Sequence, residues 1–501
     1  MKKLLLTFYI LLFTSYFALG QSWGAVGSGV NGPVYAMAVY NGELYVGGQF
    51  DSAGGIPANN IAKWDGKNWS AVGTGLTYLP IYPQTAKTVK TLTVHNGILY
   101  AGGQFDTAGG IRAICIAQWN GSNWDSVSNT FPGVRVAGIN TLLWDDSVLF
   151  AGGGSGGDGS IYVCTTPPYG IYQWNGSSWS SLAAGGGYFA ENWHGICHEG
   201  GIDNIASVNT LTQYNNSLVI GGRYTQADNG KLASQSVSFW NGLNWVGADA
   251  GLLPASLANT TVYNYGPYVA YTIGNAANVN ALLSFNGRLY AGGDFEMSSG
   301  ITCIAQWNGY SWAPVGYGIL GVSVNALAAY NGNLFAGGYF YQANTSNGNG
   351  TLANSIAKWV DTAWQPVDSG VNVTGTIQAL VEYNGALYAA GSFNTAGSLN
   401  VSNIAVYTED SSHTKNVSEP LVSTVVYPNP NSGTFYVAAQ NYPAGSHIEI
   451  YDVFGRKAFD ELLAGNTTQV NLAGQVSQGI YIYRVKASDD AVLASGKFEV
   501  M

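Results

Sequence analysis

The chain has 501 residues, of which 18 are basic and 28 acidic, so its formal net charge is −10. Charged residues make up only 9 % of it, compared with roughly 25 % in an average globular domain. An acidic chain without a basic surface excludes nucleic acid as a partner, and a hydrophobic content of 47 % excludes global disorder. The 68 glycines and the aromatic content of 13 % favour many short strands joined by turns over long helices.

The first twenty residues have the three parts of a secretory signal peptide. Lys2 and Lys3 form a positive start, residues 4–17 form an apolar run, and Ala-Leu-Gly at 18–20, with small residues at its two ends, precedes an expected cleavage site at Gln21. The apolar run is short for a membrane span, although an uncleaved anchor is the alternative. We therefore expect an exported mature chain without a transmembrane segment.

Seven copies of one repeat run from residue 21 to about residue 410. In each copy an Asn or Asp, usually followed by Gly, stands seven residues before a glycine that usually ends a Gly-Gly pair; these leading residues are Asn41, Asn96, Asp146, Asn215, Asn286, Asn331 and Asn384. Six copies also hold two Trp residues spaced five apart, beginning at Trp64, Trp119, Trp174, Trp240, Trp307 and Trp359. Both pieces predict hairpins, because Asn-Gly supplies the positive φ angles of a type I′ turn.

Each copy therefore predicts four antiparallel strands, here called a, b, c and d in chain order. Such a unit, repeated at roughly 40 to 50 residues, is typical of a β-propeller. The seventh copy has no Trp-containing strand d, whereas an additional d-like strand, Trp23–Gly27, precedes the first copy. The sequence thus predicts an all-β fold: a seven-bladed β-propeller whose last blade is closed by the N-terminal strand, which removes open sheet edges, followed by a small β-sandwich domain.

The Gly-Gly pair, followed by an aromatic residue and then by Ile-Ala-x-Trp, resembles kelch-type propeller repeats and similar repeats of secreted bacterial proteins. This resemblance implies the propeller fold. It leaves the function open, because kelch-like propellers serve both as binding scaffolds and as enzymes.

Residues 425–501 differ from the repeats in composition and motifs. Four pieces, Tyr427–Pro430, Gly433–Phe435, Ile450–Arg456 and Gly479–Val485, resemble the type A C-terminal sorting domain of the Bacteroidetes type IX secretion route. The resemblance implies that the type IX machinery carries the protein across the outer membrane, removes this domain, and releases the rest or attaches it to the cell surface. An ordinary accessory β-sandwich is the alternative. The sorting-motif residues are Pro428, Asn429, Pro430, Gly455, Gly479 and Tyr481.

The predicted domains are a signal peptide (1–20), the propeller (21–408), a polar linker (409–424) and the sorting domain (425–501).

Four cysteines raise the question of a disulfide or a metal. Cys115 and Cys303 occupy the same position of strand c in two copies, and we expect both to be buried thiols. Cys164 and Cys197 lie in two loops of the third copy and can pair in an exported protein, although sequence alone does not determine connectivity. The segment 193–199 could ligate a transition metal through two His, a Cys and a Glu, but its order matches no zinc pattern. We expect no metal and no cofactor.

The connections of the repeat differ in how much their lengths vary. The a–b and c–d connections are constant, whereas the b–c and d–a connections carry all the variation, so every long loop is expected on one face, where function usually resides. The two longest are Ala183–Ile205 and Gly251–Asn278. They hold the candidate ligand-binding residues Trp193, His194, His198, Tyr263, Tyr265, Tyr268 and Tyr271. Alternatively, these side chains pack the loops onto the sheets.

These observations predict an exported, non-catalytic and monomeric propeller scaffold that binds a glycan or protein ligand through its long loops. One alternative is a secreted carbohydrate-active hydrolase or lyase that uses the same face; another is a structural adhesin. No catalytic residue is assigned, because the acidic residues of the repeats form no evident acid–base pair.

Overall fold

A computed structural model describes residues 22–77, 87–127, 138–153, 170–182, 207–224, 226–227, 232–233, 236–248, 252, 263–265, 268–270, 277–297, 302–343, 350–409, 425–427, 431–438, 445–452, 457–463, 467–472, 474, 476–487 and 492–500. All regular secondary structure in these residues is β. No helix there has the length and apolarity that a membrane crossing needs. The chain divides into an N-terminal unit, Met1–Asp410, and a C-terminal unit, Ser411–Met501.

The N-terminal unit contains seven antiparallel sets of strands in the order a-b-c-d, here called sheets 1 to 7; sheets 4 and 5 are joined into one eight-stranded sheet where Arg223 of the one pairs with Asn278 of the other. The a strands are β2 (Val34–Tyr40), β9 (Thr88–His95), β15 (Ile139–Asp145), β19 (Ser207–Tyr214), β27 (Asn278–Phe285), β31 (Ile319–Tyr330) and β36 (Thr376–Tyr383). The b strands are β3 (Glu43–Gly48), β10 (Ile98–Gln104), β16 (Val148–Gly153), β20 (Ser217–Arg223), β28 (Arg288–Glu296), β32 (Asn333–Ala343) and β37 (Ala386–Ser392).

Strands c and d are shorter. The c strands are β6 (Ile61–Trp64), β13 (Ile116–Trp119), β17 (Ile171–Trp174), β23 (Val237–Trp240), β29 (Thr302–Trp307), β34 (Ile356–Val360) and β40 (Ile404–Thr408). The d strands of sheets 1 to 6 are β7 (Trp69–Ala71), β14 (Trp124–Ser126), β18 (Trp179–Ser181), β24 (Trp245–Gly247), β30 (Trp312–Pro314) and β35 (Ala363–Pro366). Additional short strands lie in the connections: β4 (Ser52–Ala53), β5 (Ile56–Pro57), β8 (Leu76–Thr77), β11 (Thr107–Ala108), β12 (Ile111–Arg112), β21 (Gln226–Ala227), β22 (Leu232–Ala233), β33 (Thr351–Leu352), β38 (Thr395–Ala396) and β39 (Leu399–Asn400).

The fourth strand of sheet 7 comes from the other end of the unit. Strand β1 (Ser22–Ala25) pairs antiparallel with β40, so that Ser22 lies opposite Thr408 and Ala25 lies opposite Ala405. This is the pairing that the strand count predicts. Because of it, the edge of β40 is covered instead of exposed.

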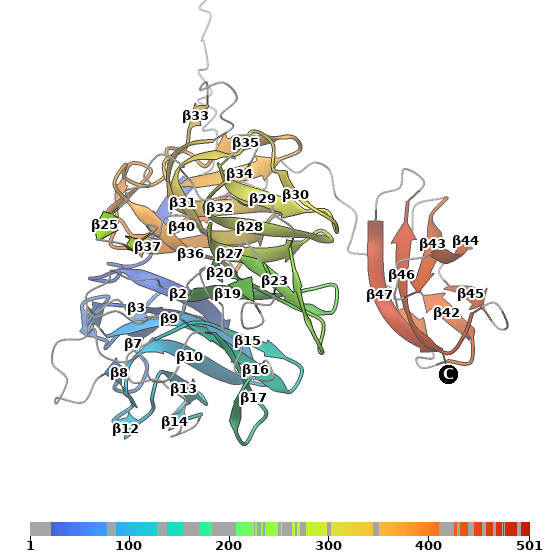
Figure 1. Ribbon diagram of the computed structural model, residues 1–501, viewed down its shortest axis with the longest axis horizontal. Coiled ribbons are helices and arrows are strands. Elements are labelled where there is room, and N and C mark those ends of the chain that lie inside the picture. The colour runs from blue at the N-terminus through green and yellow to red at the C-terminus, as the bar shows by residue number, and fades with distance from the viewer. Residues whose placement is uncertain are drawn as a thin grey trace, which may run out of the picture. The chain divides into compact units, whose positions relative to one another are not determined.

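The sheets pack on one another in a closed order. Each a strand contacts the a strand of the next sheet, and β36 of sheet 7 contacts β2 of sheet 1; the sheets follow one another from the blue β2 to the orange β36 in Figure 1. One apolar cluster lies between each neighbouring pair of sheets. The cluster between sheets 7 and 1, for example, joins Val34 and Leu44 to Tyr383 and Tyr388. The core is therefore divided among seven interfaces.

The two glycines that end strand b serve different purposes. A Cβ on Gly47 would lie 2.5 Å from a methyl carbon of Val89 in the next sheet, so the first glycine allows close packing between sheets. A Cβ on Gly48 would collide with the backbone carbonyl of Pro33, the residue directly before strand a. At this point strand a carries a β-bulge, because Val34 and Ala36 pair with Gly48 and Gly47 and leave Tyr35 between them. The second glycine thus leaves room for the bulged backbone.

The a–b turns have the expected geometry, whereas most c–d turns do not. Asn41 and Gly42 have φ angles of 49° and 76°, as a type I′ turn requires. In the first c–d turn, Trp64 pairs with Trp69, which leaves a four-residue loop between them. The carboxylate of Asp65 accepts the N–H groups of Lys67 and Asn68 there, so a side-chain cap replaces the predicted type I′ turn.

The C-terminal unit consists of two sheets over one apolar core. One sheet holds β41 (Val425–Tyr427), β42 (Thr434–Ala438) and β45 (Thr467–Asn471). The other holds β43 (His447–Asp452), β44 (Lys457–Leu462), β46 (Gly479–Lys486) and β47 (Val492–Val500). Phe435 and Val470 from the first sheet and Ile450 and Phe498 from the second lie in the same cluster.

Candidate functional site

The β-bulge described for sheet 1 occurs in all seven a strands, and it places one side chain from each strand at an equivalent position. In each sheet the extra residue lies between the two that pair with the glycine positions of strand b. Every one of these extra residues is polar. We call this set the bulge ring: Tyr35, Lys90, Asn140, Asn209, Asn280, Asn325 and Gln378.

Hydrogen bonds show that members of the bulge ring from successive sheets lie side by side. The bonds run in one direction around the unit, each donated by one sheet to the next: Lys90 Nζ to Asn140 Oδ1 (2.9 Å), Asn140 Nδ2 to Asn209 Oδ1 (3.5 Å), Asn209 Nδ2 to Asn280 Oδ1 (3.4 Å), Asn280 Nδ2 to Asn325 Oδ1 (3.1 Å) and Asn325 Nδ2 to the carbonyl of Ile377 (3.5 Å). Ser207 and Ser323 donate to Asn209 and Asn325, both at 2.8 Å. Five of the seven members of the bulge ring, from Lys90 to Asn325, thus form a polar network.

The bulge ring lies at the end of the a strands that the d–a connections enter. In six of the seven strands the ring residue is the second or third residue; β31 is the exception because it begins earlier, at Ile319. The a–b turns lie at the opposite end. The bulge ring therefore faces the side of the unit from which the connections of variable length emerge.

Lys90 is the only cation of the bulge ring. The residue is exposed, but nearby protein partly desolvates its ammonium group and lowers its pKa. Two other lysines of this unit pair with carboxylates, Lys63 with Glu43 and Lys358 with Glu409, both at 2.8 Å. Lys90 bonds instead to the neutral amide of Asn140.

Two further charged residues lie beside the bulge ring, at the junction of sheets 4 and 5. These are Arg223 and Asp294. In the strand register, Arg223 of β20 lies opposite Asn278 of β27, and Asn278 lies opposite Asp294 of β28. Partial burial raises the pKa of the Asp294 carboxyl, and the positive charge of Arg223 opposes this rise.

The side chains of the bulge ring itself are amides, a phenol and an ammonium group, and such groups hold their protonation states near neutral pH. The arrangement is therefore suited to hydrogen bonding with a ligand.

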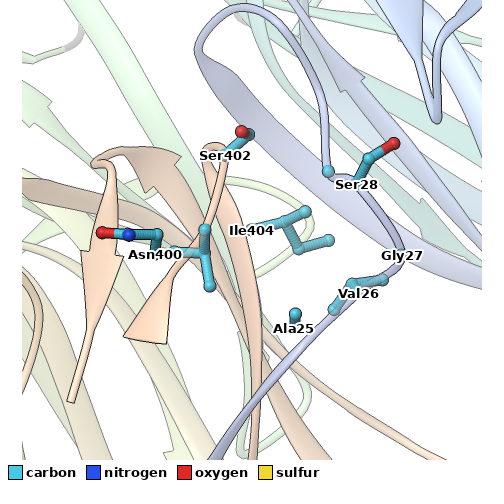
Figure 2. A pocket seen from close by; sticks show the side chains of 9 residues that line it. Ala25, Val26, Gly27, Ser28, Asn400, Ser402 and Ile404 are labelled. Carbon is cyan, nitrogen blue, oxygen red and sulfur yellow. The ribbon is translucent and has the colours of Figure 1, made fainter. Parts of the chain in front are cut away.

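A shallow pocket lies where the N-terminal strand meets sheet 7 (Figure 2). Residues 25–29, which lead out of β1, form one side, and Asn400–Ser402 with Ile404 form the other. Its polar side chains are those of Ser28, Asn400 and Ser402, and the remaining lining is apolar or backbone. It offers no charged group and fewer polar side chains than the bulge ring.

The C-terminal unit contains a compact charged cluster. His447, Glu449 and Asp460 bring their potential metal-ligating atoms within 4.8 Å of one another. However, the buried carboxylate of Glu449 already accepts hydrogen bonds from Tyr451 at 2.7 Å and Lys457 at 2.9 Å and pairs with Lys486 at 2.9 Å. These partners, Tyr451 first, lower its pKa to about 2. A divalent cation would have to displace Lys457, so the cluster is better described as a structural ion-pair network.

The structure describes few of the residues predicted to bind a ligand. Trp193, His194, His198 and Tyr271 lie outside the described residues, and so do Cys164 and Cys197. Tyr263, Tyr265 and Tyr268 lie on the hairpin of β25 (Tyr263–Tyr265) and β26 (Tyr268–Ala270), where Tyr265 pairs with Tyr268. Their role remains a prediction.

Other predicted residues are described. Cys115 and Cys303 are buried thiols, as expected, and burial raises the pKa of Cys115 to about 12. Gly479 begins β46, and Tyr481 packs in the core of the C-terminal unit. Pro428, Asn429, Pro430 and Gly455 lie outside the described residues.

The bulge ring was missed at the level of sequence. A signal exists: in every repeat the Val or Ile that begins the apolar part of strand a is followed by a polar residue or Tyr, as in Val34-Tyr35 and Ile377-Gln378. In a regular strand, a polar residue after an apolar one is part of the usual alternation of buried and exposed positions. Only the register against strand b identifies it as a bulge.

Comparisons with known proteins concern mainly the C-terminal unit. Residues 425–495 match the family described as secretion system C-terminal sorting domain. The chain ends in a sorting domain. Its presence shows that the protein is exported through the type IX route to the cell surface or the medium. No curated protein sequence matches the chain.

Three solved structures to which the chain is similar have low TM-scores. A fungal alcohol oxidase in complex with copper has a TM-score of 0.42 at 12 % identity, covering 96 % of this chain and 99 % of its own. Extracellular domains 1–2 of Drosophila Semaphorin 1a have a TM-score of 0.38 at 9 % identity, covering 78 % and 88 %. PorZ, a surface component of the type IX system of Porphyromonas gingivalis, has a TM-score of 0.24 at 12 % identity, covering 96 % and 75 %. At these scores the similarities carry no argument about function.

Proposed function

We propose that the N-terminal unit is a kelch-like, seven-bladed β-propeller that acts as a non-catalytic binding scaffold. The cyclic contacts of the seven a strands support the propeller. So do two links between the first and last sheets: β1 pairs with β40, and the Tyr383 hydroxyl donates to the Gly42 carbonyl at 3.0 Å. Residues 1–20 would be the signal peptide and 409–424 the linker to the sorting domain.

Removing the closing strand tests this architecture. A chain that lacks residues 22–29 loses the partner of β40 and the buried Trp23 side chain. We expect it to melt at a clearly lower temperature and with less cooperativity than the full chain. An unchanged melting transition would contradict closure through β1.

The ligand site is proposed at the end of the propeller that carries the bulge ring and the long connections. The observation that carries this proposal is the ring itself, in which seven repeats each present a polar side chain at one level. Amide side chains offer paired donors and acceptors that match the hydroxyl groups of a glycan or the backbone of a peptide. The loops with Trp193, His194, His198, Tyr263, Tyr265, Tyr268 and Tyr271 would add aromatic and imidazole groups around it, and Cys164–Cys197 would brace one of them.

A binding screen of the full exported chain against an array of bacterial and host glycans tests this function. The comparison variant replaces residues 183–205 and 251–276 with copies of the short connection between sheets 5 and 6. We expect the wild-type chain to bind and the variant to lose binding at an unchanged melting temperature. Binding that survives the replacement would refute the loop assignment, and no binding to any glycan or surface protein would refute the scaffold.

A further inference from the structure

The hydrogen-bonded series of the bulge ring is interrupted. It begins at Lys90 in sheet 2 and ends at the carbonyl of Ile377 in sheet 7. Between these ends lie Gln378 in sheet 7 and Tyr35 in sheet 1. Within the described part of the chain, neither of these two side chains has a hydrogen-bond partner. We call Gln378, Tyr35 and Lys90 the open arc.

The three members of the open arc are neighbours. Their strands, β36, β2 and β9, contact one another in this order, and the three residues occupy the same bulge position. The open arc thus combines an amide, a phenol ring and an ammonium group. In the rest of the ring, from sheet 3 to sheet 6, every position is Asn and is already bonded to its neighbour.

Lys90 gives the open arc its chemical preference. Lys90 is exposed, but nearby protein displaces part of the hydration of its ammonium group, and no carboxylate of the described residues pairs with it to offset this loss. Lys90 has one neutral acceptor, Asn140, and two further N–H donors. In a chain with only 18 basic residues, this position favours an anionic group supplied from outside.

We infer that the open arc binds a carboxylate-bearing sugar, such as a uronate unit of an acidic polysaccharide. Lys90 would donate to the carboxylate, Gln378 would exchange hydrogen bonds with ring hydroxyls, and Tyr35 would supply a flat apolar face and a hydroxyl. The amide and the phenol favour a sugar over a simple anion, which needs neither. This inference rests on the proposed binding function of this end of the unit and narrows its ligand class.

Calorimetry on the full chain tests the inference with two probes, a trisaccharide of galacturonate and the neutral trisaccharide of galactose. We expect the acidic probe to bind at least tenfold more tightly, and its affinity to fall with added salt. The variant Lys90→Gln, which keeps a donor for Asn140, should lose at least tenfold in affinity for the acidic probe. Lys90→Arg should retain most of it. Lys63→Gln removes the same charge outside the bulge ring and should change the affinity less than twofold.

Equal loss in Lys90→Gln and Lys63→Gln, or equal affinity for the two trisaccharides, would overturn the inference. So would tighter binding of a triglutamate peptide with the same dependence on Lys90. If glycans on the array bind through the long loops while the acidic probe does not bind, the scaffold stands and only the open arc is refuted. If neither glycans nor peptides bind, the scaffold proposal fails as well.

Discussion

The two ends of the a strands, one at the a–b turns and the other at the bulges, differ in how far their side chains vary between sheets. At the turn end, four tyrosines donate their hydroxyls to a glycine carbonyl in the a–b turn of the next sheet: Tyr40 to Gly97, Tyr214 to Gly287, Tyr330 to Gly385 and Tyr383 to Gly42. At the bulge end the backbone geometry repeats but the side chains vary, from Asn to Gln, Tyr and Lys. The turn end thus links the sheets, whereas the bulge end presents a surface that can differ from sheet to sheet.

Three sheets have no tyrosine at this position, and in one of them another contact replaces the hydrogen bond. In sheet 2 the equivalent residue is His95, whose ring stacks on Trp144 of sheet 3 with the ring centroids 4.2 Å apart. Asp145 and Phe285 occupy the position in sheets 3 and 5. The turn end therefore tolerates the loss of single links, since the apolar clusters between the sheets remain.

The largest effect is expected where the bulge meets strand b. In Gly222→Ala, the new Cβ would collide with the Ser207 carbonyl, and relief requires the bulge to move. We expect a loss of at least about 3 kcal/mol in the free energy of unfolding, measured by urea denaturation. Ala390→Gly, at the neighbouring glycine position in sheet 7, should cost about 1 kcal/mol or less. Similar losses in both variants would contradict the assigned role of the second glycine.

A smaller effect is expected within the bulge ring. Asn280→Ala removes the hydrogen bonds that link its side chain to Asn209 and Asn325, whereas Asn209 keeps its bond to Asn278 and Asn325 keeps the bond that Ser323 donates. We expect a loss of about 1–2 kcal/mol in unfolding free energy. Ser284→Ala, at an exposed position of the same strand, should stay within about 0.5 kcal/mol of wild type. A neutral Asn280→Ala would show that the ring is not part of the stable framework.

At the turn end, Tyr383→Phe removes only the hydroxyl that bonds to Gly42. The expected loss is about 1 kcal/mol, the typical net contribution of such a hydrogen bond. The reverse change, Phe285→Tyr, places a hydroxyl where sheet 5 lacks one and should gain up to about 1 kcal/mol. Thermal and urea unfolding would measure the change in unfolding free energy of both variants. A change in the same direction in both would contradict the role assigned to the tyrosine hydroxyls.

The smallest effect is expected at Cys303. Its φ angle is 67°, and at the same position of other sheets Asn60 and Asn403 have φ angles of 64° and 61°. Those amides donate to carbonyls of Leu76 and Val30, both at 2.8 Å, whereas the Cys303 sulfur is 3.9 Å from its acceptor. Cys303→Asn should therefore stabilise the fold by about 0.5 kcal/mol. Cys303→Val should destabilise it, because a β-branched residue disfavours positive φ.

Much of the fold follows from short-range features of the sequence. Asn41-Gly42 and its equivalents specify the a–b turns, because few residue types adopt two successive positive φ angles. The count of Trp-containing strands predicts that β1 completes sheet 7. The c–d turns were predicted less well, because Asp65 caps a longer loop with its side chain, and the residue types of the two turns are alike.

The candidate site, in contrast, depended on tertiary structure. The sequence by itself determined that strand a alternates, that a glycine pair ends strand b, and that Lys90 and Gln378 are polar. It did not determine that these residues share one ring, because a bulge is a one-residue offset that appears only when strand a is paired with strand b. The interruption at Tyr35 depends further on the contact between β36 and β2, whose residues are more than 300 positions apart in the chain. Long-range pairing of this kind decides which polar side chains of the described residues bond to one another and which do not.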